Sequence, residues 1–244
     1  MIDLHCHYLP GVDDGARTME EGLNLARAAV ANGIREAVLT PHVHPGHFDN
    51  CRTTLEPVFH EFRDQLQLEG IALQVHLGAE VRLLPDSLEL LRRGELPMLG
   101  QWGQQLTMLV ELPHDSVPVG ALEAMCYLRR RGIMPILAHP ERNKDVIRDW
   151  RRLRPFVEGD VCHLQLTAGS VIGTFGEPAQ QTARRLLEAS WVTLVASDAH
   201  NLHNRPPLMR EAREAIALWY GEDAAQLLTD THPGKFISKS TQPA

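Results

Sequence analysis

Short apolar runs alternate with longer segments of helical periodicity along the whole chain, and this alternation constrains the fold most. The 244-residue chain carries such runs at Ile2–Leu4, Ala37–Leu39, Ala72–Leu77, Thr107–Leu112, Met134–Ala138, Val161–Leu166 and Val192–Ala196. A helix, or a loop long enough to hold one, follows each run, which is typical of parallel strands joined by crossover helices. The pattern predicts an α/β domain, closed into a (β/α) barrel that leaves no free sheet edge. An open doubly wound sheet remains an alternative, since the runs are one short of the usual eight.

Several intervening segments carry helix signals. The first predicted helix begins at the capping box Thr18-Met-Glu-Glu21 and continues with an apolar stripe, Leu23, Ala26, Val30 and Ile34. A second stripe consists of Leu55, Val58, Phe59, Phe62 and Leu66. Further helices are predicted over Val119–Arg131, Ala179–Ser190 and Leu208–Tyr220. No glycine-rich dinucleotide or P-loop sequence opens any of them, which argues against a nucleotide-binding fold.

Polar residues that follow the runs are the clearest functional signal. His, Asp or Glu residues lie at or just beyond the carboxyl ends of six of the seven runs. They are His5, His7, Asp14, His42, Glu80, Glu111, His139, Asp198 and His200. Barrel enzymes place their active sites at this end of the strands. The regularity predicts one shared polar site.

The residue types in this set indicate metal binding. Side chains two apart on a strand share a face, so His5 and His7 can reach one ion while Cys6 points away. Imidazoles with carboxylates suit Zn, Mn or Fe, and a set without thiolates argues against a structural zinc site. Nine candidates exceed what one ion binds, so two or three ions are expected. Ions about 3.5–4 Å apart can acidify a bridging water and stabilise both oxygens of a phosphoryl transfer.

Composition excludes several classes of protein. The formal net charge is −7 and no basic block is present, which argues against a nucleic-acid binder. No apolar stretch approaches the ~20 residues that a bilayer requires, and the N-terminus does not resemble a signal peptide.

Four widely spaced cysteines indicate free thiols in a cytoplasmic protein. Residues 238–244 are expected to form a disordered tail.

Six short motifs together resemble the PHP (polymerase and histidinol phosphatase) superfamily. They are His5-Cys-His7, Leu9-Pro-Gly-Val-Asp-Asp-Gly-Ala16, Thr40-Pro-His42, Ala79-Glu80, His139-Pro-Glu-Arg142 and Ser197-Asp-Ala-His-Asn201. The turn that begins at Leu9 and the run from His139 to Arg142 are similar to those of the manganese-dependent protein-tyrosine phosphatases of bacterial capsule and exopolysaccharide loci. The resemblance covers about residues 1–237 and implies one PHP phosphatase domain.

This resemblance implies a distorted (β/α)7 TIM-like barrel that holds three divalent metal ions, Mn in the family, with Fe or Zn also compatible. His5, His7, Glu80 and Asp198 would bind the first ion. Glu80 would bridge to a second ion, held also by Glu111 and His139. Asp14, His42 and His200 would bind the third. Arg142 and Arg205 match arginines that contact the substrate phosphate, as the donor geometry of a guanidinium allows.

The implied activity is hydrolysis of phosphotyrosine on proteins by a metal-bridging hydroxide, as in a protein-tyrosine phosphatase. The implied partner is an autophosphorylating bacterial tyrosine kinase that controls polysaccharide synthesis. A histidinol-phosphate or other small phosphomonoester phosphatase on the same scaffold is the nearest alternative. An inactive regulatory module is disfavoured because every ligand position is filled. A zinc amidohydrolase is disfavoured because no lysine precedes Lys144.

For four residues the sequence allows either a functional or a purely structural role. Arg142 could pair with Glu141, and Arg205 could be a solvated surface charge. Asp13 could cap its turn, and Asp3 could either support the histidine pair or begin the strand. The chain departs from the family pattern at Cys6 and Tyr8 and in a histidine-rich loop after His42. Further histidines near the expected mouth of the site are His44, His47, His114 and His203.

Overall fold

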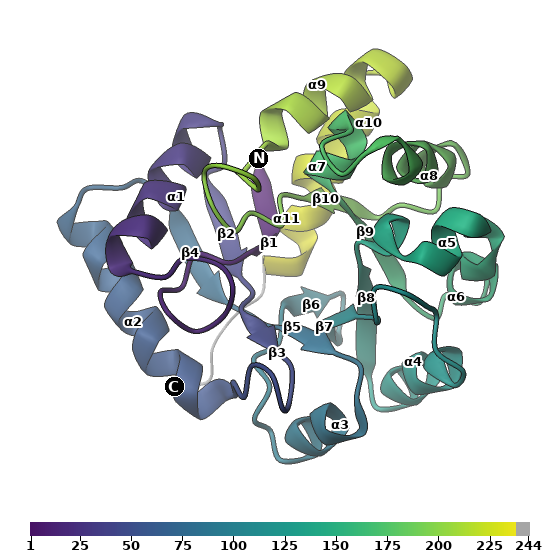
Figure 1. Cartoon of the computed structure of the whole chain (residues 1–244), viewed down its shortest axis with the longest axis horizontal. Coiled ribbons are helices and arrows are strands. Elements are labelled where there is room, and N and C mark those ends of the chain that lie inside the picture. The colour runs from purple at the N-terminus through teal and green to yellow at the C-terminus, as the bar shows by residue number, and fades with distance from the viewer. Residues whose placement is uncertain (238–244) are drawn as a thin grey trace.

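The computed structural model describes residues 1–237, which form a barrel of seven parallel staves (Figure 1). We use the word stave for one position in the barrel wall, occupied by a single strand or by two consecutive short strands. They are β1 (Ile2–Cys6), β2 (Glu36–Leu39) with β3 (His42–Val43), β4 (Gln74–Leu77) with β5 (Glu80–Arg82), β7 (Gln105–Glu111), β8 (Ile133–Ala138), β9 (His163–Thr167) and β10 (Leu194–Ala196). Two of these staves are interrupted, yet hydrogen bonds from Gly78 N to Leu39 O (2.8 Å) and from Glu80 N to Pro41 O (3.1 Å) bridge the interruption. The seven apolar runs are therefore confirmed as strands.

The staves follow one another in chain order and close into a ring. One sheet has the order β1-β2-β4, and the other runs β10-β9-β8-β7-β5-β3. A parallel bridge between Cys6 and Ala199 joins the first stave to the residues after β10. There Asp198 N donates to His5 O (2.7 Å) and His7 N donates to Ala199 O (2.9 Å). The predicted barrel is confirmed, and the doubly wound alternative is wrong.

Helices surround the staves on the outside (Figure 1). The five predicted helices are confirmed as α1 (Met19–Ala31), α2 (Arg52–Leu68), α4 (Ala121–Arg130), α8 (Glu177–Glu188) and α9 (Met209–Tyr220). Elements that sequence reasoning missed are the antiparallel strand β6 (Gly100–Trp102), α3 (Pro85–Arg92), η1 (Pro140–Arg142), α5 (Lys144–Arg148), η2 (Trp150–Leu153), α6 (Arg154–Glu158), α7 (Ala168–Ile172), α10 (Glu222–Gln226), η3 (Leu227–Thr231) and α11 (His232–Ile237). Most are too short to show a helical period.

The predicted capping box of α1 forms on one side only. Thr18 Oγ1 accepts a hydrogen bond from Glu21 N (3.2 Å), which satisfies one unpaired amide of the first turn. The Glu21 carboxylate accepts instead from Arg17 N (2.9 Å). The helix start was thus predicted correctly. The Glu21 side chain, however, accepts from the residue before the N-cap and not from the N-cap residue Thr18, as a full capping box requires.

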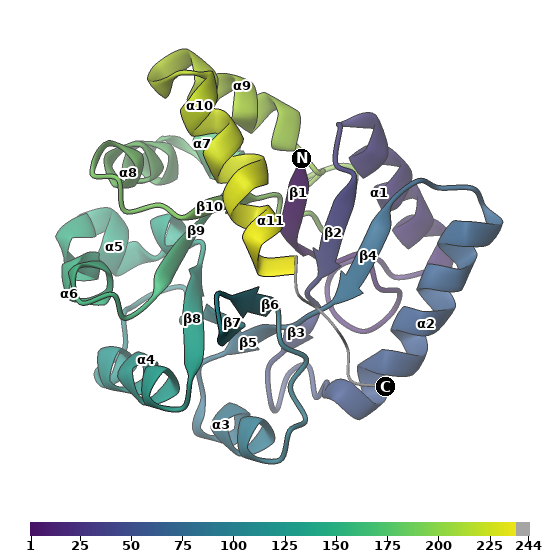
Figure 2. The ribbon, with the colours of Figure 1, turned by 180° about the vertical axis from the view of Figure 1, so that it is seen from behind.

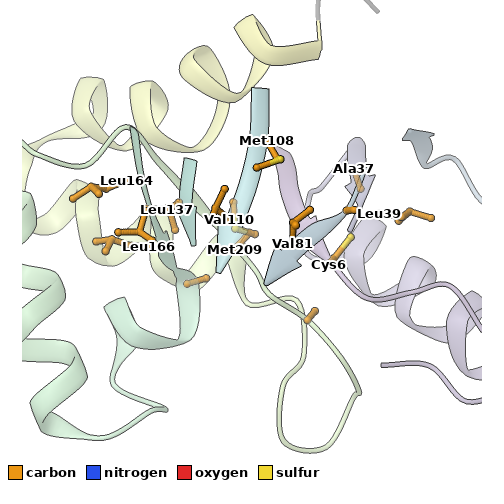
Figure 3. Close-up of a cluster of buried hydrophobic side chains, with 14 of the residues drawn as sticks. Cys6, Ala37, Leu39, Val81, Met108, Val110, Leu137, Leu164, Leu166 and Met209 are labelled. Carbon is orange, nitrogen blue, oxygen red and sulfur yellow. The ribbon is translucent and has the colours of Figure 1, made fainter. Parts of the chain in front are cut away.

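Alternating strand residues build two apolar layers. Outward-facing residues such as Met108, Val110, Leu137, Leu164 and Leu166 pack beneath the helices (Figure 3). Inward-facing residues fill the barrel itself: Leu4, Val38, Leu109, Ile136, Ala138, Leu194 and Ala196. Since successive side chains of a strand point to opposite faces, one run supplies both layers.

The C-terminal helix α11 closes the amino-terminal end of the barrel. It lies across that end beside β1 and β6 (Figure 2). Phe236 is fully buried in the inner apolar layer, and its ring centroid lies 4.7 Å from that of Trp102. A Cβ atom on Gly100 would come within 2.3 Å of Phe236 O, so only glycine allows this approach. Polar access to the barrel is therefore left to the carboxyl-terminal end.

Two sequence predictions concern the chain as a whole. The single domain over residues 1–237 stays a prediction, and the predicted tail, 238–244, lies outside the described residues. Among the residues described, no helix combines the length and apolarity needed to cross a membrane.

Candidate metal centre

The predicted metal ligands converge at the carboxyl ends of the staves. Eight of them fall into three overlapping clusters whose ligand atoms lie within 4.8 Å of one another. The clusters are His5, His7, Glu80 and Asp198; His42, Glu80 and Glu111; and His7, Asp14, His42 and His200. The ninth, His139, directs Nε2 at Glu80 Oε1 (2.8 Å) and lies 3.9 Å from Glu111 Oε1. The fold thus brings all nine together.

The first cluster is fully enclosed and has the polarity of a cation site. Nε2 of His5 lies 3.2 Å from Nε2 of His7 and 3.1 Å from Glu80 Oε2. Asp198 Oδ1 lies 3.3 Å from the same nitrogen of His5. Glu80 Oε2 and Asp198 Oδ1 are buried without a hydrogen-bond partner among the described residues. Buried oxygens are rarely left unpaired, so two such atoms facing two imidazole nitrogens fit a divalent ion.

The other two clusters share residues with the first. Asp14 Oδ1 lies 3.4 Å from Nε2 of both His42 and His200, and Nε2 of His200 is another buried atom without a hydrogen bond. His42 also directs Nδ1 at Glu80 Oε2 (3.1 Å). His42 and Glu80 therefore lie between clusters, as bridging ligands of a multinuclear site would.

The electrostatics hold one carboxylate and two imidazoles of this donor set in the protonation states that metals require, whereas neighbouring carboxylates outweigh burial and raise the pKa of His5, His7 and His42. Burial favours the neutral acid at Glu80, but His5, His42 and His139 outweigh it and hold the pKa of Glu80 well below its usual range. Burial and the Arg142 charge lower the pKa of His139 to about 3. Burial and His7 lower the pKa of His200 to about 4. A neutral imidazole is the form that binds a metal ion.

Glu111 has a different environment from Glu80. Burial and the neighbouring charge of Glu80 raise the pKa of Glu111 to about 7. Its Oε2 lies 3.2 Å from Arg82 Nε. The neighbouring carboxylates of Glu80 and Glu111 repel one another unless a cation lies between them, so this pair also fits a divalent ion.

Two predicted ligands occupy strained backbone positions. His139 has φ 32° and Asp198 has φ 53°, in the left-handed region that residues other than glycine seldom adopt. Asp3 stabilises the second of these turns, since Oδ1 accepts from Ser197 N (2.9 Å) and Oδ2 accepts from Ser197 Oγ (2.5 Å). Asp3 therefore supports the site as well as belonging to the strand.

Two further supporting residues were missed as such. Asp13 accepts a hydrogen bond from Gly15 N (2.9 Å), as a turn-capping residue would, and it also lies 2.7 Å from His7 Nδ1. Gln165 Oε1 lies 2.9 Å from His5 Nδ1. Metal-binding histidines commonly donate their second nitrogen to such an acceptor. The sequence feature that could have drawn attention to Gln165 is its place between Leu164 and Leu166, in the one apolar run that no candidate ligand follows.

Arg142 and Arg205 lie beside the clusters and share one acceptor. Arg142 Nη1 and Arg205 Nη2 both donate to Asp198 Oδ2, the latter at 2.5 Å. The ion pair of Arg142 is thus with Asp198, while Glu141 accepts from Thr167 N (2.9 Å). The two oxygens of Asp198 are divided between the histidines and the arginines.

A cavity of about 280 Å³ opens onto this arrangement. Its lining contains predicted ligands from all three clusters, three arginines and three residues of the histidine-rich loop: Asp14, His42, His44, His47, Phe48, Glu80, Arg82, Glu111, His139, Arg142 and Arg205. The volume and the cationic wall suit a phosphate ester whose phosphorus lies near the clusters.

A family model described as "Capsular polysaccharide synthesis, CpsB/CapC" matches residues 1–238. The chain belongs to the CpsB/CapC family. The resemblance to phosphatases of capsule loci is thereby confirmed. Tyrosine-protein phosphatase YwqE of Bacillus subtilis is 34% identical to this CpsB/CapC member over 230 residues, covering 94% of this chain and 89% of the relative. Tyrosine-protein phosphatase CpsB of Streptococcus pneumoniae is 31% identical over 242 residues, covering 97% and 98%.

One solved structure agrees with the family assignment, and a second shares the fold. One, described as belonging to "unique metal-dependent tyrosine phosphatases" from these two organisms, superposes with a TM-score of 0.83 at 34% identity, covering 93% of this chain and 94% of the other. Dihydropyrimidinase from Brevibacillus agri superposes with a TM-score of 0.60 at 12% identity, covering 96% of this chain and 69% of the other. The second likeness concerns the barrel fold alone.

Proposed function

We propose that this CpsB/CapC protein is a metal-dependent protein-tyrosine phosphatase. The observation that carries the proposal is the cavity in which unpaired buried ligand atoms and two arginines meet. Metal-binding residues alone would suit many hydrolases, but an adjacent arginine pair matches a dianionic phosphate. Relatives that span nearly the whole chain are named tyrosine-protein phosphatases.

Each proposed residue has a distinct task. Arg142 and Arg205 would bind and orient the phosphate oxygens. The nine ligands would hold three divalent ions, Mn for preference: the first by His5, His7, Glu80 and Asp198, the second by Glu80, Glu111 and His139, and the third by Asp14, His42 and His200. Ions bound there would lower the pKa of a water molecule and neutralise charge on the phosphate. Asp198 would connect the two parts, since one of its oxygens faces the histidines and the other faces the arginines.

The leaving group also fits this site. A tyrosine phenol has a pKa of about 10, so it departs readily and requires little help from an acid. We propose that the substrate is a phosphotyrosine on a bacterial tyrosine kinase that regulates capsular or exopolysaccharide synthesis. The four free cysteines support a cytoplasmic location, where thiols stay reduced.

A metal and substrate assay tests the proposal. Protein purified without added metal should contain divalent ions by elemental analysis and should hydrolyse a phosphotyrosine peptide. EDTA should abolish this activity, and Mn²⁺ should restore it. His139→Ala and Asp198→Ala should lose both turnover and bound metal. Faster hydrolysis of histidinol phosphate than of the peptide would favour the alternative phosphatase, and wild-type metal content in either variant would refute the ligand assignment.

Arg205→Ala separates phosphate binding from metal binding. Its KM for the peptide should rise roughly 10–100-fold, because a charge-assisted hydrogen bond contributes about 1.5–3 kcal/mol. Its metal content should stay unchanged. Arg63→Ala on α2 is the matched control, since Arg63 is exposed and pairs only with its neighbour Asp64 in the described chain. An unchanged KM in the Arg205 variant would contradict its role.

A further inference from the structure

The ring of Phe175 contacts two of the three arginines that line the cavity, Arg142 and Arg205. Arg142 Cζ is 4.7 Å from the ring centroid, and Arg205 Cζ is 5.9 Å from it. The ring is 37% exposed, although most phenylalanines of the chain are buried. An aromatic residue held at the surface, against two cations that face one cavity, requires an explanation beyond packing.

We propose that Phe175 is a positioning residue for phosphate binding, which holds Arg142 and Arg205 with their N–H edges directed at the cavity. The inference rests on the proposed function, since it takes the two arginines as the phosphate contacts. Phe175 would act through the arginines, without itself touching the phosphate.

The charges at this point show why such a residue is needed. Two guanidinium groups converge on one oxygen, Asp198 Oδ2, so they share a single hydrogen-bond acceptor and repel one another at close range. An aromatic ring presents a negative face that attracts a cation without using its N–H donors. A guanidinium that stacks on a ring keeps its planar edge free for a phosphate. Phe175 thus contributes attraction to both cations while it leaves their hydrogen bonds available.

The backbone of the α7–α8 connection holds the ring in place. Gly169 O accepts hydrogen bonds from Thr174 N (2.9 Å) and Thr174 Oγ1 (3.0 Å). A Cβ atom on Gly169 would lie 2.7 Å from Phe175 Cε2 and 2.5 Å from Thr174 Oγ1, so the glycine makes room for both side chains. Gly173 and Gly176 flank the pair at φ 88° and 89°, which side chains rarely allow. This short turn is therefore organised around the position of Phe175.

Ring-removing and ring-retaining variants test the inference. Phe175→Ala and Phe175→Leu remove the aromatic face, and the leucine variant keeps most of the apolar volume. Phe175→Tyr retains the face. Tyr127→Ala is the matched control, because Tyr127 on α4 is 36% exposed and its ring centroid lies 5.9 Å from Arg131 Cζ. It is thus a similar cation–π contact, but it is not part of the cavity lining. All are compared in the metal-loaded protein by KM and kcat on a phosphotyrosine peptide, calorimetric binding of inorganic phosphate, metal content and Tm.

Both ring-less variants should raise KM and the Kd for phosphate about tenfold, which is about 1.4 kcal/mol, as expected for two cation–π contacts. Their kcat and metal content should stay within about twofold of the wild type. Phe175→Tyr and Tyr127→Ala should match the wild type.

Three results would overturn the inference. They are unchanged phosphate binding in the alanine variant, wild-type binding in the leucine variant, or loss of bound metal with unchanged KM, which would indicate a structural role. A wild-type protein inactive on phosphotyrosine would instead refute the proposed function. The phosphate-binding measurement would still decide whether Phe175 positions the arginines.

Discussion

Replacing Asp13 by asparagine should weaken metal binding without removing any predicted ligand. The Asp13 side chain is 0% exposed and accepts three hydrogen bonds, at Oδ2 from His7 Nδ1 (2.7 Å) and His42 N (3.0 Å) and at Oδ1 from Gly15 N (2.9 Å). Burial favours its neutral form, but the His7 charge and these hydrogen bonds outweigh burial and lower the pKa of Asp13. The side chain is therefore a carboxylate at neutral pH.

The magnitude follows from the hydrogen-bond geometry. An asparagine amide has one acceptor and one donor group, so either orientation places an NH2 group against at least one N–H donor. The variant also loses the charge that holds the His7 ring with Nε2 toward the first cluster. Supporting carboxylates of this kind contribute 10–100-fold to metal affinity. A loss of about 1.4–2.7 kcal/mol in metal binding is expected, since each tenfold is about 1.4 kcal/mol.

Titration of Mn²⁺ into chelator-stripped protein measures the effect directly. Asp13→Asn should bind more weakly and should regain activity at higher metal concentration. Asp49→Asn is the matched control, because Asp49 accepts from Gly46 N (2.6 Å) in the next loop and is exposed. Wild-type affinity in Asp13→Asn would show that this carboxylate only caps its turn and would refute the reasoning.

Two stability predictions concern the opposite end of the barrel. Burial and Arg129 lower the pKa of His163 to about 4, so the unfolded chain takes up a proton there first as the pH falls from about 6.5. The Tm of the metal-free wild type should thus drop more between pH 6.5 and 4 than that of His163→Phe, and parallel curves would contradict this. Phe236→Ala should lose about 3–5 kcal/mol in urea unfolding because Phe236 is fully buried. Leu218→Ala, 84% exposed, should change stability by under about 0.5 kcal/mol, and a similar small loss at Phe236 would show that α11 is not needed to close the barrel.

Sequence reasoning predicted the staves and the convergence of the candidate ligands with few errors because both follow from local rules. Apolar runs of strand length alternate with helical stripes, and parallel strands present their carboxyl ends at one edge. Glu80 and Asp198, which are far apart in the chain, could therefore be assigned to one site from their places after two runs. The family motifs then added the grouping of ligands and the two arginines.

Supporting residues could not be predicted in the same way. Asp13 resembles an ordinary turn cap, and the polar Gln165 within an apolar run shows an unusual residue but not that its partner is His5. Phe175 lies in a glycine-flanked turn with no motif, and its role depends on arginines 33 and 30 residues away in the sequence (175 − 142 and 205 − 175). Such contacts depend on stave register and turn geometry, which local periodicity does not encode.

By itself, the sequence determined the strand-and-helix order, the polar edge of the barrel and the residue types of its candidate ligands, because each depends on residue type and short-range spacing. Only the tertiary structure decided how the ring closes at Cys6 and Ala199, how α11 covers the other end, and which oxygen of Asp198 faces the arginines. These features depend on distances between segments remote in the chain, and such distances exist only after the staves have closed and their side chains have packed.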